Sequence, residues 1–381
     1  MGIFRELEQT GHERLVFFYD RETGLKSIIG IHSTALGPTL GGCRMWNYAS
    51  ESDALTDVLR LSKAMTYKSA VAGLDLGGGK GIIIGDPQGA NKPELLRAFG
   101  RAVESLEGCY ITTEDVGIGV PDVDLIRTTT KYVVGGSQAG GAGDPSRMTA
   151  LGVFKGMQAL LKYAQLGESL EGLRVAVQGI GNVGYRLCKY LAEAGVKLIV
   201  CDIHPERVNR AVEEFGAQAV SPSEIHRVDC EILAPCALGA VLNARTIPEM
   251  RCKVVAGAAN NQLELQSDVL ALHERGIIYI PDYVINAGGL INVAAELGGY
   301  NEDAVRAKVS KIASTIDLIL ARSQVEELLP LQVADSLAEE RIAQAKAKQT
   351  GNVKEAGRKE QPTPGIFIRP GMGMSQVNLR G

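Results

Sequence analysis

Two lysines in the first third of the chain have the surroundings that chemistry requires. Lys80 follows three successive glycines in LDLGGGKGIII, and Lys68 lies in MTYKSA. The first segment is not a P-loop, because Gly81 follows Lys80 where that motif needs Ser or Thr. Two lysines that lie close together disfavour each other's charge, so one of them can lose its proton near neutral pH and act as a general base. The other would then hold an anionic group. A solvated surface lysine is the alternative for each, and above all for Lys68.

Asp115, in TTEDVG (112–117), is a candidate proton relay. An acid that caps a helix or a turn is the alternative reading of this residue. The five histidines show neither metal-ligand nor triad spacing, and no two of the seven cysteines are spaced as CxxC. The sequence therefore predicts no metal site and no disulfide framework.

A glycine-rich turn in the second half of the chain indicates dinucleotide binding. Gly179-Ile180-Gly181-Asn182-Val183-Gly184 follows the apolar run RVAVQ and opens a helical stretch. In such a turn the first glycine makes the bend, the second lets a pyrophosphate approach, and the third lets the helix pack on the strand. Asp202 closes the next strand, where its carboxylate can accept from ribose hydroxyls and would repel a 2′-phosphate. We therefore expect NAD. Arg207 keeps NADP open, and a purely structural turn is the other alternative.

The composition excludes several classes of protein. The chain has 381 residues, of which 45% are hydrophobic and 22% are charged, and its formal net charge is −4. This balance fits a folded globular chain and gives no basic excess for nucleic acid. No apolar run is long enough to cross a membrane, and the N-terminus lacks an apolar secretory core. We therefore expect a cytoplasmic protein.

The apolar pattern changes in character near the middle of the chain. Before it, strands at 14–18 and 27–32 flank a turn, and helices at 52–67 and 92–106 surround a short strand at 81–84. After the Gly- and Ser-rich stretch 135–146, short apolar runs alternate with helical stretches, which is typical of a parallel sheet covered on both faces. The expected strands are 174–179, 197–202, 230–235, 253–257 and 277–282, with helices at 183–194 and 205–215 between them.

We therefore predict an α/β fold of two domains with a catalytic cleft between them. Residues 1–135 should form a substrate and oligomerisation domain, and residues 140–325 a doubly wound, Rossmann-type NAD-binding domain. The chain from 302 to 346 is helical in pattern, and the part 326–348 should return to the first domain. The polar, Gly- and Pro-rich stretch 349–381 should be a flexible tail.

Five segments together resemble one known family. They are GPTLGGCRMWNYAS (37–50), MTYKSAVAGLDLGGGKGIIIGDP (65–87), YITTEDVG (110–117), GIGNVG (179–184) and PDYVINAGGLINVAAELGGYN (281–301). They are similar to the glutamate/leucine/phenylalanine/valine dehydrogenases, and to the leucine branch of that family in particular. The resemblance runs from about residue 10 to about residue 346. It implies reversible oxidative deamination, in which an L-amino acid, NAD and water give a 2-oxo acid, NADH and ammonium.

The resemblance also implies roles for individual residues. Lys68 would hold the substrate carboxylate, Lys80 would activate water and move protons, and Asp115 would assist that transfer. Thr149 would contact the nicotinamide amide, in a cofactor site that also takes in the glycine turn and Asp202. The nicotinamide end would be lined by Cys236, Ala237, Asn260 and Asn261, the last of them beside the substrate. The family further implies a homo-oligomer, between a dimer and an octamer.

The implied side-chain pocket is apolar. It would consist of Leu40, Leu290 and Val293, with Gly41 and Thr113 nearby. Such a pocket disfavours glutamate, because a buried, unpaired carboxylate is costly. We expect leucine, valine and isoleucine as substrates, with an aromatic amino acid such as phenylalanine or tryptophan as the alternative. Two positions depart from the usual leucine dehydrogenase pattern, which has valine at 290 and alanine at 113.

Two functions from other classes fit the sequence less well. A 2-hydroxy-acid dehydrogenase shares the nucleotide-binding half, but it needs a His–Asp or His–Glu pair that the sequence does not offer. A non-enzymatic NAD-binding protein would be favoured by loss of Lys68, Lys80 or Asp115, and all three are present.

Overall fold

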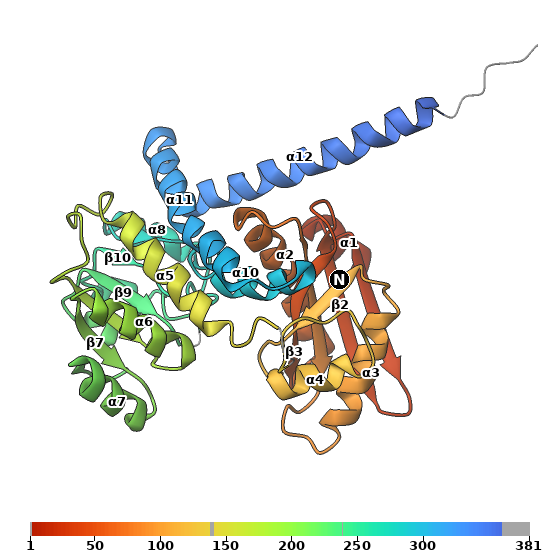
Figure 1. Ribbon diagram of the computed structural model, residues 1–381, viewed down its shortest axis with the longest axis horizontal. Coiled ribbons are helices and arrows are strands. Elements are labelled where there is room, and N and C mark those ends of the chain that lie inside the picture. The colour runs from red at the N-terminus through yellow and green to blue at the C-terminus, as the bar shows by residue number, and fades with distance from the viewer. Residues whose placement is uncertain (1, 138–140, 238, 360–381) are drawn as a thin grey trace, which may run out of the picture.

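The computed structural model describes the backbone of residues 2–137, 141–237 and 239–359, and the side chains as far as residue 349. Two α/β domains lie side by side and are linked at their common edge by helices (Figure 1). The expected two-domain α/β fold is confirmed. No helix in the described part of the chain is both long enough and apolar enough to cross a membrane.

The first domain is built on a five-stranded sheet of order β1-β2-β4-β3-β5. The strands β1 and β2 form the expected antiparallel hairpin, and β3 runs parallel to both β4 and β5. The elements are α1 (Ile3–Thr10), β1 (Arg14–Asp20), β2 (Leu25–Ser33), β3 (Thr39–Trp46), α2 (Glu51–Val71), β4 (Gly77–Ile84), α3 (Lys92–Glu104), β5 (Tyr110–Thr113) and α4 (Val120–Arg127).

The strand β4 begins four residues earlier than the sequence pattern predicted, and it includes the three glycines before Lys80. A Cβ atom at Gly78 would lie 2.6 Å from the Ser62 carbonyl oxygen on α2, and one at Gly79 would lie 2.7 Å from the Tyr110 ring. Side chains at these positions would push α2 and β5 away from the strand. Gly78 therefore lets α2 lie directly against the centre of the sheet, and Gly79 leaves room for the Tyr110 ring.

The second domain has a six-stranded sheet of order β11-β10-β9-β6-β7-β8 in which all pairs are parallel. The chain turns from one half of the sheet to the other beside β6, as in a doubly wound fold. The strands are β6 (Arg174–Gln178), β7 (Lys197–Cys201), β8 (Gln218–Ala219), β9 (Ile232–Pro235), β10 (Val254–Val255) and β11 (Ile278–Tyr279). The helices around them are α5 (Ser146–Leu160), α6 (Asn182–Glu193), α7 (Pro205–Phe215), η1 (Ile225–Arg227), η2 (Ile247–Glu249) and α8 (Asp268–Glu274).

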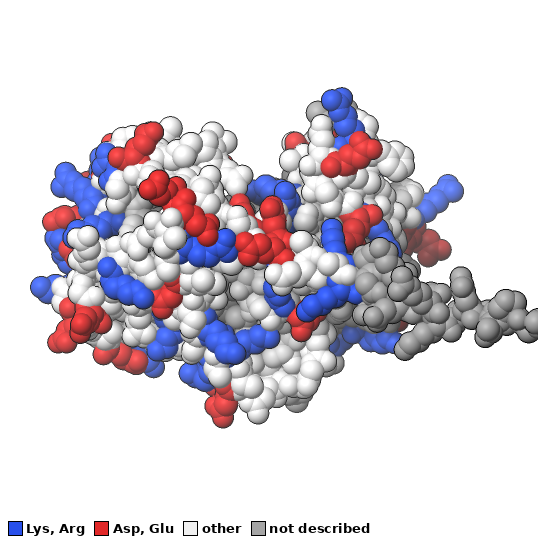
Figure 2. All heavy atoms as spheres, turned by 90° about the horizontal axis from the view of Figure 1, so that it is seen from above, with Lys and Arg blue, Asp and Glu red and all other residues white. Residues whose placement is uncertain are grey.

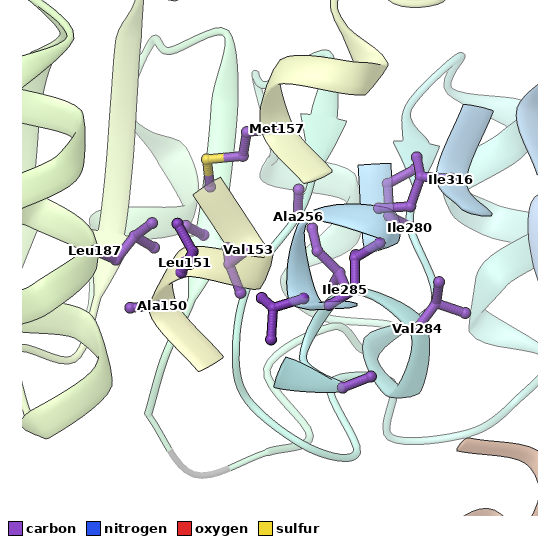
Figure 3. Packing of buried hydrophobic residues seen from close by; sticks show 14 of the residues in the cluster. Ala150, Leu151, Val153, Met157, Leu187, Ala256, Ile280, Val284, Ile285 and Ile316 are labelled. Carbon is purple, nitrogen blue, oxygen red and sulfur yellow. The ribbon is translucent and has the colours of Figure 1, made fainter. Parts of the chain in front are cut away.

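The helix α5 packs closely against later helical segments that carry Ile285 and Ile316. Gly156 on α5 allows this approach, since a Cβ there would lie 2.8 Å from side-chain carbons of both Ile285 and Ile316. Met157 and Val153 of α5 fill the adjoining space toward the sheet, as Figure 3 shows. This cluster continues into the first domain through residues such as Leu40, so the two domains share one apolar core.

The C-terminal helices first pack on α5 of the second domain and then, with the last of them, return to α2 of the first domain. They are α9 (Asp282–Ile285), α10 (Gly288–Ala294), η3 (Ala295–Gly298), α11 (Glu302–Glu326) and α12 (Pro330–Lys359). The helix α12 extends over the first domain (Figure 1), where the Arg341 guanidinium donates to the Ala70 carbonyl at the end of α2 (2.8 Å) and to the Asp75 carboxylate (2.8 Å). This long helix therefore links the two domains on the side away from their direct connection.

The helical pattern expected over 302–346 is divided, because Glu327 adopts a left-handed conformation (φ 55°) and Pro330 starts a new helix. The helix α12 then runs past 348 to Lys359, so the first residues of the expected tail 349–381 are helical. The remainder, 360–381, lies outside the described residues, as do positions 138–140 of the Gly- and Ser-rich stretch 135–146.

Candidate active site

A cleft of about 1270 Å³ separates the two domains. Figure 2 shows the surface hollowed between the two lobes, with acidic and basic side chains around the hollow. The first domain lines the cleft with Arg44 and Asp115 among others, and the second domain lines it with Gly179, Gly181 and Asp202. Of the three residues that the sequence singled out as chemical, Asp115 lines this cleft opposite the nucleotide-binding residues, whereas Lys68 and Lys80 are not among the residues that line it.

Lys80 and Asp115 form an ion pair at the base of the first-domain wall. The Lys80 ammonium donates to Asp115 Oδ2 at 3.0 Å, and the Lys80 side chain is only 5% exposed. Burial by itself would raise the pKa of the Asp115 carboxyl. The charges of Lys80 and Arg44 and their hydrogen bonds outweigh that effect, so the pKa of Asp115 is lowered below its usual value. Asp115 is therefore a carboxylate that holds the Lys80 nitrogen in place.

The local sequence explains how Asp115 reaches Lys80. A Cβ at Gly42 on β3 would lie 2.8 Å from the Asp115 Cβ, so only glycine lets the segment after β5 lie against β3. The chain then turns at Gly117, whose φ of 80° suits a residue without a side chain. The Met45 amide donates to the Val116 carbonyl at 3.0 Å and fixes the turn to the strand.

Arg44 extends this pair into a network that the sequence analysis did not predict. Its Nε donates to Asp115 Oδ2 at 2.8 Å, and its Nη1 donates to Asp57 Oδ2 at 2.8 Å. The Tyr48 hydroxyl donates to the same Asp57 oxygen at 2.7 Å, and Arg60 donates to Asp57 Oδ1 at 3.0 Å. The alternation of positions 42, 44 and 46 along one strand could have placed Arg44 beside Asp115, but no sequence signal pointed to Asp57.

Lys68 lies in the last turn of α2, and its side chain points toward Asn260 of the second domain. Its ammonium lies 3.5 Å from Asn260 Oδ1, which also accepts from the Asn286 side chain at 2.8 Å. Desolvation lowers the pKa of Lys68 to about 8, and the nearby Asp282 carboxylate opposes that shift. The two predicted lysines thus influence each other's charge, although each has its own acidic neighbour.

Asp282 and Asn286 belong to the site and were not predicted. Asp282 begins α9, shortly after the end of β11, where the carboxyl ends of parallel strands meet, and this position was a signal that could have found it. Its Oδ2 accepts from the Gln262 amide at 3.2 Å. Burial raises the pKa of the Asp282 carboxyl, which the Gln262 hydrogen bond and the Lys68 charge partly offset.

The five residues of the implied side-chain pocket lie behind the cleft and do not line it. Leu40, Leu290 and Val293 are buried in the apolar core that both domains share. Gly41 lies on β3 against β4, where a Cβ would lie 2.8 Å from the Gly79 carbonyl carbon. The Thr113 hydroxyl is buried and finds no hydrogen-bond partner among the described residues. These contacts leave an apolar environment with one unpaired hydroxyl.

The predicted glycine turn connects β6 to α6. Gly179 has a φ of 95°, and a Cβ at Gly184 would overlap the Gly179 carbonyl oxygen, so the helix packs tightly on the strand. Gly181 is the N-cap of α6, and a Cβ on it would meet nothing nearer than Arg207 at 3.9 Å. Asn182 and Val183 form the first turn of that helix. The open space in front of free helix N–H groups fits a pyrophosphate.

Asp202 follows β7 with a carboxylate that two backbone amides hold. Oδ2 accepts from the Ile180 amide at 2.7 Å, and Oδ1 accepts from the His204 amide at 2.9 Å. Arg207 approaches Oδ2 at 3.8 Å, and its charge is thereby directed to Asp202. The fixed carboxylate at this edge of the cleft fits a ribose with free hydroxyls.

The remaining predicted residues divide into two groups. Cys236, Ala237, Asn260 and Asn261 all line the cleft. Thr149 does not line it, and its hydroxyl donates to the Pro145 carbonyl at 3.0 Å within α5. The described residues hold no group of three or more His, Cys, Asp or Glu side chains arranged to bind a metal ion.

Comparison with known proteins identifies the same two domains in a family. The model described as "Glu/Leu/Phe/Val dehydrogenase, dimerisation domain" matches residues 12–132, and that described as "Glutamate/Leucine/Phenylalanine/Valine dehydrogenase" matches 140–204 and 202–350. A leucine dehydrogenase of Geobacillus stearothermophilus is 52% identical over 90% of this chain and 94% of its own length. A valine dehydrogenase of Streptomyces virginiae is 46% identical over 89% of this chain and 96% of its own.

A solved structure agrees with these matches. The crystal structure of L-tryptophan dehydrogenase from Nostoc punctiforme superimposes with a TM-score of 0.80, at 43% identity, over 91% of this chain and the whole of the other. The sequence identity, the coverage and the fold all point to one conclusion. The chain belongs to the glutamate/leucine/phenylalanine/valine dehydrogenase family and is an amino-acid dehydrogenase.

Proposed function

We propose that this enzyme catalyses the reversible, NAD-dependent oxidative deamination of a branched-chain L-amino acid, with leucine, valine and isoleucine as substrates. The amino acid, NAD and water would give the 2-oxo acid, ammonium, NADH and a proton. The observation that carries the proposal is the Lys80–Asp115 ion pair, whose Asp115 lines the same cleft as Gly179 and Gly181 of the glycine turn. The similarity to enzymes named leucine dehydrogenase supports the substrate class.

The two lysines would have different tasks in this reaction. Lys68 would hold the substrate carboxylate, because its pKa of about 8 leaves it mainly protonated at neutral pH. Lys80 would take the proton from water as that water adds to the imino carbon, and Asp115 would keep the Lys80 nitrogen aimed at it from 3.0 Å. When NAD is bound, it accepts the hydride from the substrate's Cα. Closing the cleft would exclude bulk water from that step.

Two features favour NAD over NADP as the cofactor. The Asp202 carboxylate is fixed by two amides, so it cannot easily turn away from a 2′-phosphate. Arg207, the cation that would neutralise such a phosphate, is directed to Asp202 instead. Both interactions penalise an additional negative charge at this edge of the cleft.

The preference for aliphatic side chains would come from the core behind the cleft. Leu40, Leu290 and Val293 offer only hydrocarbon and belong to one buried apolar cluster. A glutamate side chain would therefore lose its hydration without gaining a charged partner. A difference of one methylene changes the free energy of such a contact by only about 1–3 kcal/mol, so several aliphatic substrates should be accepted.

The enzyme should act as a homo-oligomer that assembles through the first domain. The family model over residues 12–132 is described as a dimerisation domain. In the described residues, β1 is an edge strand that pairs only with β2, and it exposes Phe17 (51%) and Tyr19 (71%). A row of unpaired backbone groups beside exposed aromatic rings suits pairing with a second copy. We place the reaction in the cytoplasm, where the seven cysteines would remain reduced.

The substrate is tested by NADH formation, followed by absorbance, with NAD and one amino acid in each reaction. L-leucine, L-valine and L-isoleucine should turn over rapidly, while L-phenylalanine, L-tryptophan and L-glutamate should be slow. Rapid turnover of the aromatic amino acids alone would show that the proposed branched-chain substrate class is wrong. The proposed oxidative deamination would still stand. A lack of turnover on all six would overturn the proposed function.

Lys80→Ala should lower turnover of the best substrate by about 10²–10⁴-fold, because the base that activates water is removed. Binding of NADH, measured by fluorescence titration, should persist, since Lys80 lies in the other domain. Lys253→Ala is the matched control, because Lys253 is exposed and lies outside the site. It should leave turnover unchanged. Turnover of Lys80→Ala at the wild-type rate would contradict the role of Lys80.

Asp202→Ala should narrow the preference for NAD over NADP by about tenfold or more, because an interaction with a charged group is worth on the order of 1.5–3 kcal/mol. The quantity to compare is the ratio of kcat/KM for the two cofactors. Asp303→Ala, on the exposed first turn of α11, is the control. An unchanged ratio in Asp202→Ala would refute the assignment of cofactor choice to this residue.

Light scattering coupled to size-exclusion chromatography should return a multiple of the single-chain mass for the wild type. Phe17→Lys should shift the mass to smaller species, because it places a charge on the edge strand. Leu270→Lys, on an exposed position of α8 in the second domain, should not change the mass. A wild-type mass equal to one chain would overturn the oligomer proposal.

A further inference from the structure

A line of alternating charges leads from the buried lysine of the site to the outer surface of α2. It begins with Lys80, continues through Asp115, Arg44 and Asp57, and ends at Arg60. Each neighbouring pair is separated by 2.8–3.0 Å. Arg44 stands at its centre, and it is the only member whose guanidinium contacts two carboxylates.

Two donors share a single oxygen of Asp115. The Lys80 ammonium and the Arg44 Nε both donate to Oδ2, at 3.0 Å and 2.8 Å. Among the described residues no donor is assigned to Oδ1. Any change in the charge of Lys80 is therefore felt at the same atom that Arg44 holds.

The side chains in this line are largely removed from water. Lys80 is 5% exposed, and Asp57, Arg44 and Asp115 are between 14% and 19% exposed. Charges interact more strongly in such surroundings, and a buried carboxylate without a counter-charge is costly. Once Lys80 gives up its proton, Asp115 needs another positive charge, and Arg44 is the nearest one.

The other end of Arg44 is fixed, so the guanidinium cannot leave Asp115 without losing a second partner. Asp57 Oδ2 accepts from Arg44 Nη1 at 2.8 Å and from the Tyr48 hydroxyl at 2.7 Å. Arginine keeps its charge at all accessible pH values, and its planar group can bind two acids in a fixed geometry. A lysine in its place would keep the charge but could not contact both carboxylates in the same way.

We propose that Arg44 is a positioning residue for the reaction: it keeps Asp115 ionised and directed at Lys80 while Lys80 exchanges its proton. This inference rests on the proposed function, in which Lys80 acts as the base. In this role Arg44 contacts neither Lys80 nor the substrate, and it acts on Lys80 through Asp115. Its positive charge makes the neutral form of Lys80 less costly, because the carboxylate retains a partner.

Several other charged or titratable groups lie around the same atoms and contribute to the local potential. Lys68 acts on Asp115 from the end of α2, and Glu114 acts on it from the end of β5. Among the described residues, the titratable groups that act on Asp115 or Arg44, directly or through a shared neighbour, are Cys43, Tyr48, Asp57, Arg60, Lys68, Lys80, Tyr110 and Glu114, with Asp144 and Asp282 one contact further away. None of these replaces the direct Arg44 contact to Asp115 Oδ2.

The test is the pH dependence of kcat/KM for oxidative deamination. In Arg44→Met the ascending limb should move to higher pH by about one unit, since the proton on Lys80 is then held by a carboxylate with no other partner. Activity should therefore recover in alkaline solution. Arg44→Lys should keep its limb near the wild-type position. Arg101→Met, which removes an exposed arginine paired with Asp20 in the same domain, is the matched control and should not move the limb.

Asp57→Asn provides a second variant whose effect has the opposite sign. It removes a negative charge beside Arg44, so the limb should move to lower pH, and by less than in Arg44→Met because Asp57 is one contact further from Lys80. A purely structural role for Arg44 would lower kcat/KM equally at every pH. The ascending limb would then stay at its wild-type position in both Arg44→Met and Asp57→Asn. That result, or a shift of both variants in the same direction, would overturn the proposal.

Thermal unfolding gives a readout that needs neither cofactor nor turnover. The pKa of Asp115 is lowered in the folded protein, so its stabilising contribution is present above about pH 4 and is lost as the pH falls through the folded value. Arg44→Met should therefore lower Tm relative to the wild type near neutral pH, and the difference should shrink in acid. A difference that is constant with pH would contradict the coupling of Arg44 to Asp115. If the wild type deaminates no amino acid, the proposed function fails while this measurement still decides the coupling.

Discussion

The ion pair between Lys80 and Asp115 is the contact around which the first domain is arranged. A lysine at 5% exposure is stable only if a counter-charge reaches it, and the counter-charge comes from a segment 35 residues further along the chain. Gly42 gives that segment its room, and Arg44 balances the carboxylate from the same strand. A buried charge thus dictates the small residues and the turn around it.

Close packing of backbone on backbone lets the site form between layers. Gly78 lets α2 pack directly on β4, which brings Lys68 at the end of α2 close enough to Lys80 for the two charges to interact. In the second domain, Gly184 brings α6 onto β6 and leaves its N-terminus facing the cleft. In both domains glycine is used where a side chain would separate two elements that must touch.

The two domains are joined by more than the chain that passes between them. They share an apolar core that contains Leu40 of the first domain and Leu290 of the second. On the far side, α12 packs on the first domain, where Arg341 holds the carbonyl end of α2. These contacts fix the two walls of the cleft relative to each other from both sides.

The sequence alone determined the elements whose signals are local. The turn Gly179–Gly184, the alternating apolar runs and the acid after the second strand are read from neighbouring residues, and the resemblance to a family rests on such segments. The network of Arg44 with Asp115 and Asp57 was decided by tertiary structure, as were the place of Asp282 beside Lys68 and the split of the last helical region at Glu327. These side chains become a site only when distant strands and helices bring them within hydrogen-bond distance, and no spacing in the sequence records that approach.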